Sequence, residues 1–69
     1  MKITPSALKR GHDPQDILHA IDNAIAVTAL DEGIEMIVGP ARDATLLEVG
    51  IRDGEVVFHC MPARHRFLR

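Results

Sequence analysis

The chain lacks the covalent and metal reinforcements that small proteins commonly carry. It has 69 residues and one cysteine, Cys60, so no disulfide can form within it. Its histidines and cysteine do not occur at the paired short spacings of a zinc finger, and we expect no metal and no cofactor. One short domain, residues 1–69, has a thin core. We therefore expect a partner chain to reinforce it, most simply as a homodimer.

Long apolar segments are also missing. No apolar run approaches the roughly 18 residues that span a membrane. Residues 1–5 lead directly into a capped helix, without the apolar region of a signal peptide. These features predict a cytoplasmic protein with no membrane partner, and a single thiol suits a reducing compartment.

Aromatic residues are scarce. The chain has no Trp, no Tyr and only two Phe, Phe58 and Phe67. Proteins that recognise single-stranded nucleic acids commonly stack bases on aromatic side chains. We therefore expect that any RNA binding by this chain is mainly electrostatic.

Positive charge is nearly absent from the middle of the chain. All ten acidic residues lie between Asp13 and Glu55, where only two arginines oppose them. Both ends carry cations and histidines without any acid; these residues are Lys2, Lys9, Arg10 and His12 at one end, and Arg64, His65, Arg66 and Arg69 at the other. If the fold joins the two basic ends, they form a cationic surface for a polyanion.

Two helix starts follow each other near the beginning of the chain. Thr4 and Asp13 can each cap a helix, and a proline follows each of them at the first helical position. Gly11 is suited to the left-handed conformation that ends a helix. Apolar residues then recur at helical spacing, which predicts a second helix over about 14–25 with one apolar side.

After residue 25 the apolar pattern changes to alternation. Four segments read as strands, namely 26–30, 34–38, 45–52 and 55–61, and they are separated by short turns. Consecutive strands with short turns pair as an antiparallel meander. The order of elements predicts an α+β fold in which two N-terminal helices pack on one face of a four-stranded antiparallel meander sheet.

The dipeptide Asp53-Gly54 is the strongest hairpin signal, because a two-residue type I′ turn needs a positive φ at both positions. The pairs that follow from such a turn are Arg52 with Glu55, Val49 with Phe58, Leu47 with Cys60, and Glu48 with His59. Phe58 and Cys60 then face the core. Glu48 and His59 lie about 5 Å apart on the other face. That face also holds Leu46, Ile37, Val57 and Met61, and we expect Leu46, Val57 and Met61 to form an interface.

Three segments together resemble BrnT-like toxins of type II toxin–antitoxin systems. These segments are LKRGHDPQDILHAIDNAIAV, IVGPARDATLLEVGI and VVFHCMPARHRFL, and they cover nearly the whole chain in the family's order. The resemblance implies a fold related to RelE-type ribonuclease toxins. It further implies cleavage of RNA (mRNA) without metal, neutralisation by a small cognate antitoxin, and dimerisation. Arg10 stands where the family usually has a histidine, and Pro62 stands where it usually has a serine.

The resemblance matches Lys9 and Arg10 to a basic pair of the family, and Arg64 to the arginine of its last element. Metal-free RNA cleavage needs groups that move protons and cations that stabilise the phosphate charge. We expect Glu48, His59 and Arg64 to be catalytic. We expect the RNA phosphates to be bound by Lys9, Arg10, His12, His65 and Arg66.

Two other readings of the sequence stay open. The chain can be a small dimeric interaction module without catalysis, which holds a partner protein through the exposed apolar sheet face. It can also bind nucleic acid without cutting it. In both readings the pair of Glu48 and His59 is a surface ion pair.

Overall fold

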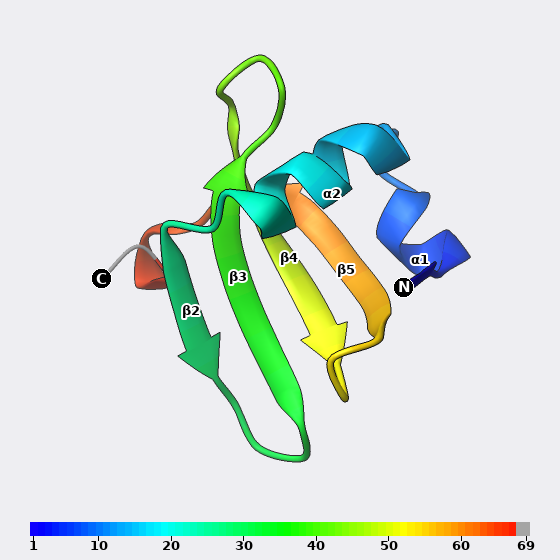
Figure 1. The fold of residues 1–69 in the computed structure, drawn as a ribbon, viewed down its shortest axis with the longest axis vertical. Coiled ribbons are helices and arrows are strands. Elements are labelled where there is room, and N and C mark those ends of the chain that lie inside the picture. Colours follow the sequence, from blue (N-terminus) through cyan, green and yellow to red (C-terminus); the bar gives the residue numbers. More distant parts are fainter. Residues whose placement is uncertain (68–69) are drawn as a thin grey trace.

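A five-stranded sheet forms the body of the computed structural model, which describes residues 1–67 (Figure 1). The strand order is β1-β5-β4-β3-β2. The strands are β1 (Lys2–Ile3), β2 (Ala26–Ala29), β3 (Ile34–Pro40), β4 (Leu46–Arg52) and β5 (Val56–Pro62). Two α-helices, α1 (Pro5–Leu8) and α2 (Pro14–Asp22), cover one face of the sheet, and a 3-10 helix, η1 (His65–Phe67), follows β5.

The expected four-stranded antiparallel sheet is wrong, because the sheet is mixed. Strands β2 to β5 form the antiparallel meander, but β1 adds a fifth strand that pairs with β5 in parallel. The N–H of Lys2 donates to the carbonyl oxygen of Glu55, and the N–H of Thr4 to that of Val57, each at 2.9 Å. Two residues are too few to show an alternating pattern, so the sequence carried no local signal for β1.

The helix starts are confirmed. The Thr4 hydroxyl accepts from the N–H of Ala7, and the Asp13 carboxylate accepts from the N–H of Gln15. Helix α2 ends at Asp22, three residues before the expected end. The N–H of Ile25 already donates to the carbonyl oxygen of Val38 in the sheet. Among residues 1–67, no helix has the length and apolar character needed to cross a membrane.

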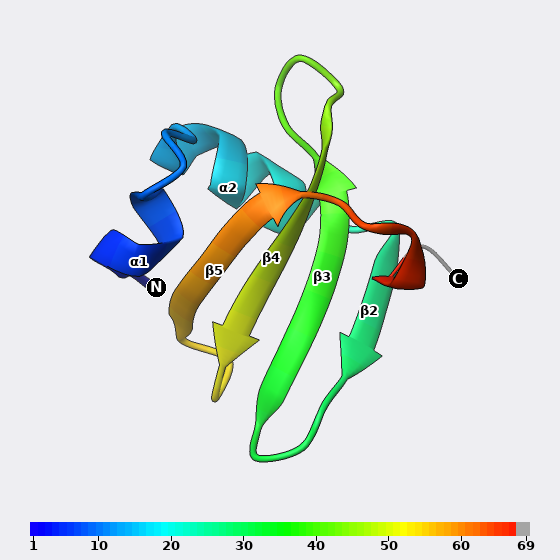
Figure 2. The ribbon, with the colours of Figure 1, turned by 180° about the vertical axis from the view of Figure 1, so that it is seen from behind.

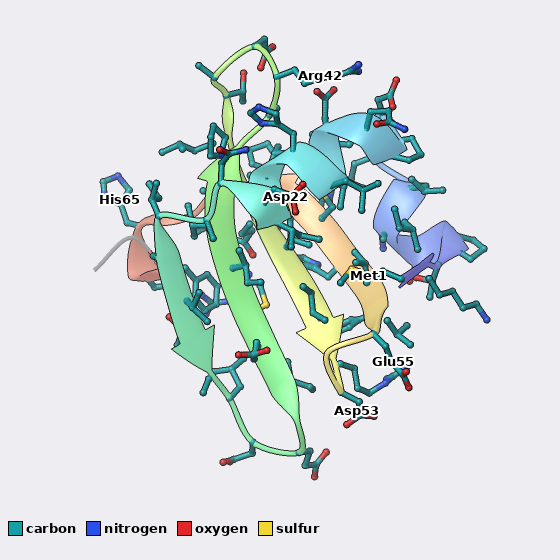
Figure 3. All side chains as sticks on the ribbon, in the orientation of Figure 1. Met1, Asp22, Arg42, Asp53, Glu55 and His65 are labelled. Atoms are coloured by element: carbon teal, nitrogen blue, oxygen red, sulfur yellow. The ribbon has the colours of Figure 1, made fainter. Side chains whose placement is uncertain are left out.

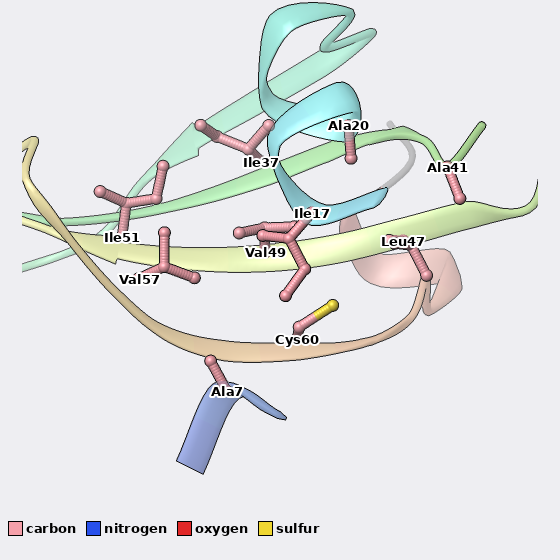
Figure 4. Packing of buried hydrophobic residues seen from close by; sticks show 10 residues of the cluster. All are labelled: Ala7, Ile17, Ala20, Ile37, Ala41, Leu47, Val49, Ile51, Val57 and Cys60. Atoms are coloured by element: carbon pink, nitrogen blue, oxygen red, sulfur yellow. The ribbon is translucent and has the colours of Figure 1, made fainter. Parts of the chain in front are cut away.

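The main core lies between the helices and the sheet, on what we call the helix-covered face (Figure 4). Ile17 and Ala20 of α2 pack there against Val49 and Val57, and all four side chains are fully buried. Cys60 also belongs to this cluster, which confirms that it points into the core. Close packing of these small and branched side chains fixes α2 against the central strands.

The β4–β5 hairpin has the expected turn, but its residue pairs differ from the expected ones. Asp53 and Gly54 both have positive φ, at 55° and 70°, as a type I′ turn requires. However, Arg52 pairs with Val56, and a bulge at Phe58 then shifts the register again, so that Val49 pairs with Cys60. A bulge places two residues opposite one and turns the side chains around it. The expected pairing of Val49 with Phe58 is therefore wrong.

These shifts change which side chains face the helices. Val57, expected in an exposed interface, is fully buried on the helix-covered face, while Phe58, expected in the core, lies on the opposite face. Ile37 also lies on the helix-covered face, contrary to expectation. The cause on β3 is Gly39, because a side chain there would collide with the carbonyl oxygen of Ala20 in α2. Helix α2 therefore packs on the face of β3 to which the odd-numbered residues, such as Ile37, point.

The opposite face of the sheet has its own cover (Figure 2). After β5, the chain crosses the ends of β4 and β3 and reaches η1 beside β2. Phe67 of η1 is buried there against Met36 and Val38, and Leu46 and Ala63 pack at the edge of this cluster. This second, smaller core holds the C-terminal segment in place over the face that carries Glu48.

Candidate functional site

Glu48 is a fully buried carboxylate in the middle of the sheet. It lies on β4 between Leu47 and Val49, which both point into the main core, so its own side chain points to the opposite face. Its exposed fraction is 0%. A buried carboxylate is costly unless it is paired and hydrogen-bonded.

Four hydrogen bonds satisfy the two oxygens of Glu48. Its Oε1 accepts from the backbone N–H of Arg64 at 3.0 Å and from Arg64 Nε at 2.9 Å. Its Oε2 accepts from Arg64 Nη2 at 2.7 Å and from His59 Nε2 at 2.9 Å. A carboxylate has about four acceptor positions, and all of them are used here. Arg64 thus binds in the two-pronged geometry that arginine favours with carboxylates.

The local charges keep Glu48 ionised. Burial by itself raises the pKa of the carboxyl group, but the hydrogen bonds from Arg64 and His59 outweigh burial and lower the pKa of Glu48 to about 2. The same contact raises the pKa of Arg64 above its ordinary value. Glu48 is therefore an anion across the neutral range, and it can only accept hydrogen bonds.

This charge state fixes the tautomer of His59. Because the Glu48 carboxylate cannot donate, His59 Nε2 must carry the proton that lies between them. A neutral His59 then has its lone pair on Nδ1, and no described residue hydrogen-bonds to that nitrogen. The His59 side chain keeps 29% of its surface exposed. The imidazole is therefore oriented by a buried carboxylate and offers a proton acceptor on its other side.

A hollow of about 290 Å³ opens next to His59 on the opposite face. We call this cavity the hollow. The residues that line it are Leu30, Ile34, Met36, Phe58, His59, Arg64, Arg66 and Phe67. The guanidinium groups of Arg64 and Arg66 lie 5.5 and 5.0 Å from the centre of the Phe67 ring. These cation–π contacts hold both arginines against Phe67, which lines the same hollow.

Arg64 has binding capacity left after its contact with Glu48. Its guanidinium has five N–H donors, and two of them serve Glu48. The side chain is 42% exposed. The arrangement can therefore bind an anion with Arg64 and Arg66 while His59 Nδ1 accepts a proton from a group beside that anion.

The structure brings together only part of the set that the sequence suggested. Glu48, His59 and Arg64 form one cluster, and Arg66 lines the same hollow. His65 lies exposed on η1 and does not line the hollow; Figure 3 shows it at the β2 side of the sheet. Arg69 lies outside the described residues.

Lys9, Arg10 and His12 are not part of this cluster. They follow α1, which packs on β5 and lies at the other side of the sheet from η1 (Figures 1 and 2). The two basic ends of the chain are therefore not joined into one surface by residues 1–67. The expected interface is also divided, since Leu46 and Met61 lie on the opposite face whereas Val57 is buried under the helices.

The sequence reasoning missed the apolar part of the hollow. Phe58 reaches it only because of the bulge, which the pattern did not predict. Phe67 did carry a signal, because a lone aromatic residue within a basic segment is a candidate anchor. For metals, residues 1–67 contain no group of three or more His, Cys, Asp or Glu side chains that could hold an ion.

Comparison with known proteins gives no match for this chain: no family model, no curated protein and no solved structure is similar to it.

Proposed function

We propose that this chain is a metal-independent endoribonuclease whose reaction centre is His59 beside Arg64 and Arg66. The observation that carries the proposal is the fully buried Glu48, which binds both His59 and Arg64 and holds them at the mouth of a hollow. A buried carboxylate behind an imidazole is an arrangement that general bases use. Arginines beside it suit a phosphodiester.

The reaction needs only groups that the chain supplies, together with water. His59 Nδ1 takes the proton of a ribose 2′-hydroxyl, and the 2′-oxygen forms a bond to the neighbouring phosphorus. The bond from phosphorus to the 5′-oxygen breaks, and that oxygen takes a proton from water. The protonated His59 returns its proton to the solvent. The products are a 2′,3′-cyclic phosphate and a 5′-hydroxyl end.

The arginines and Glu48 have different roles in this proposal. Arg64 and Arg66 stabilise the charge that builds up on the phosphate oxygens. Glu48 is fully buried, so it acts as a positioning residue through His59 and Arg64 and does not touch RNA. Lys9, Arg10 and His12 have no role at this centre. The further proposal of a toxin that a small antitoxin neutralises rests on the resemblance to BrnT-like toxins.

The test is incubation of the purified chain with mixed RNA in EDTA, with mapping of the product ends. We expect cyclic phosphate and 5′-hydroxyl ends, and a loss of rate of roughly 100-fold or more in His59→Gln and Arg64→Gln. Matched controls are His19→Gln, whose imidazole binds the carbonyl oxygen of Pro40, and Arg42→Gln, whose ion pairs are with Asp13 and Asp16. Uncut RNA with folded wild-type chain rejects the proposal.

The positioning role of Glu48 has a separate readout. Glu48→Gln can present its amide N–H to His59, which favours the tautomer with the lone pair on Nε2. We expect the cleavage rate of this variant to fall and its dependence on pH to change shape. An unchanged pH profile at reduced rate means that Glu48 only supports the fold.

A second candidate function is a non-catalytic interaction module, and the β2 edge favours it. Strand β2 is at the edge of the sheet. Its Val27 side chain is 57% exposed, and the side chains of the flanking Ile25 and Leu30 are 63% and 45% exposed. Such an edge can add a strand from another chain. We expect Val27→Lys to abolish dimers in sedimentation, whereas Leu18→Lys on α2 leaves them intact. A monomeric wild type at all concentrations argues against a second copy as the partner.

A further inference from the structure

The two phenylalanines of the chain meet in one place. Phe58 lies on β5 and Phe67 on η1, and both line the hollow. Phe58 reaches it through the bulge, and Phe67 through the segment that crosses the sheet. A chain with no other Phe and no Trp or Tyr thus collects its aromatic rings beside His59.

The hollow also has two chemically different kinds of lining residue. Leu30, Ile34 and Met36 form an apolar wall, and Phe58 adds an aromatic ring. Arg64, Arg66 and His59 provide cations and a proton acceptor. Among the described residues that line the hollow, none is acidic. The buried Glu48 carboxylate is bonded to two of the lining residues, His59 and Arg64. This combination suits a ligand with a flat apolar body and an attached anion.

We propose that the hollow is a subsite for one unpaired nucleotide of single-stranded RNA, which takes the base against Phe58 and the apolar wall and the adjoining phosphate at Arg64 and Arg66. This inference rests on the proposed function and names its substrate class. A base held in the hollow positions the ribose next to it near His59. A paired base cannot enter, because its faces are stacked and its edge is bonded within the duplex.

The experiment compares two short RNA ligands that cannot be cut, because every ribose is 2′-O-methylated. One is a trinucleotide, and the other is the same molecule with an abasic central residue. We expect the wild-type chain to bind the complete trinucleotide about tenfold more tightly, as the contact of one base with an aromatic wall predicts. Equal affinities for the two ligands overturn the subsite.

Variants test whether the preference arises in the hollow. Phe58→Ala and Leu30→Ala each remove part of the wall, and we expect the tenfold preference to shrink to about twofold. Leu30 is 45% exposed, so Leu30→Ala keeps the test valid if Phe58→Ala fails to fold. Leu18→Ala is the matched control, because Leu18 is also a partly exposed leucine, at 36%, but lies on α2 at the other face of the sheet. A preference that survives in both hollow variants contradicts the proposal.

The binding result is independent of catalysis. A chain that prefers the complete trinucleotide but leaves RNA uncut in EDTA rejects the ribonuclease and retains the subsite. A chain that cuts RNA but binds both ligands equally rejects the subsite and retains the ribonuclease.

Discussion

Glu48 joins the sheet to the C-terminal segment through a buried carboxylate. It is the one charged residue among the fully buried side chains of residues 1–67. It binds β5 through His59, and through Arg64 it binds the C-terminal segment that follows β5. Removing one partner of a buried ion pair costs more than the pair contributes, because the other charge is left unpaired. Stability and site geometry therefore depend on the same carboxylate.

Acid should unfold the protein through Glu48. A carboxyl group whose pKa falls from 4.5 to about 2 on folding contributes on the order of 3 kcal/mol of stability above pH 4.5. The lowered pKa means that this contribution is complete above pH 4.5 and is lost as the pH falls toward 2. We expect denaturant titrations to show this decline in the wild type.

The variant Glu48→Gln tests whether Glu48 is the source of this pH dependence. Its free energy of unfolding should be lower than that of the wild type at pH 7, and the difference between the two should narrow below pH 4.5. Glu55→Gln, which alters an exposed carboxylate in the hairpin turn, should follow the wild-type curve. A constant gap between wild type and Glu48→Gln from pH 7 to pH 2 contradicts the pKa shift.

Cys60 should be chemically silent in the native state. Burial, followed by the neighbouring charge of Glu48, raises the pKa of its thiol to about 11, and the side chain is only 2% exposed. The reactive form of cysteine is the thiolate. We expect no labelling by a thiol reagent at pH 8 until denaturant unfolds the chain. Fast labelling of the native protein contradicts this burial.

At the scale of elements, the position of α2 follows from a missing side chain. Gly39 is the point of β3 at which the helix backbone touches the strand, through the carbonyl oxygen of Ala20. That close approach decides which face of β3 becomes the main core. It also leaves Met36 and Val38 on the opposite face, where Phe67 covers them.

Gly39→Ala should therefore destabilise the protein, although alanine has the better intrinsic fit to regular structure. The added methyl group collides with backbone, which cannot move aside cheaply, and we expect a loss of about 1–3 kcal/mol in denaturant unfolding. Ala29→Val is the control, because it enlarges an exposed side chain on the neighbouring strand and should change stability by less than about 0.5 kcal/mol. Equal stability of Gly39→Ala and wild type contradicts the close contact.

At the scale of the whole molecule, the two basic ends of the sequence are separated. The residues after α1 lie at the β5 side of the sheet, and η1 lies beside β2 (Figure 1). All ten acidic residues lie between these two regions in the sequence, from Asp13 to Glu55. The protein therefore has two local cationic regions, and only the one at η1 adjoins His59.

This separation predicts which cations bind RNA. Each phosphate contact that is lost lowers the salt dependence of single-strand binding by about 0.7 in the slope of log K against log salt. We expect that decrease for Arg66→Gln. The double variant Lys9→Gln/Arg10→Gln removes more charge from the other end and should leave the slope unchanged. A larger effect of the double variant contradicts the placement of RNA at the hollow.

Part of the candidate site was predictable despite a wrong register. The sequence placed Glu48 opposite His59, whereas Glu48 pairs with Met61 and His59 with Gly50. Beyond the bulge the true pairing differs from the expected one by two residues. Because side chains alternate with a period of two, a register error of two residues leaves Glu48 and His59 on the same face of the sheet. They are then diagonal neighbours and not directly opposite each other. Arg64 could not be placed in this way, because it follows β5 and its position depends on η1.

The local structure was predictable from short stretches of the sequence. The Thr4 and Asp13 caps, the positive φ angles at Asp53 and Gly54, and the four alternating strands are all properties of a few adjacent residues. Three other features depend on how the whole chain packs: the parallel pairing of β1, the bulge at Phe58, and the face of β3 that α2 covers. The alternation of apolar and polar residues shows that a strand has two different faces. It does not show which face another element will cover. That choice depends on contacts between distant segments, and so does the cluster of Glu48, His59 and Arg64.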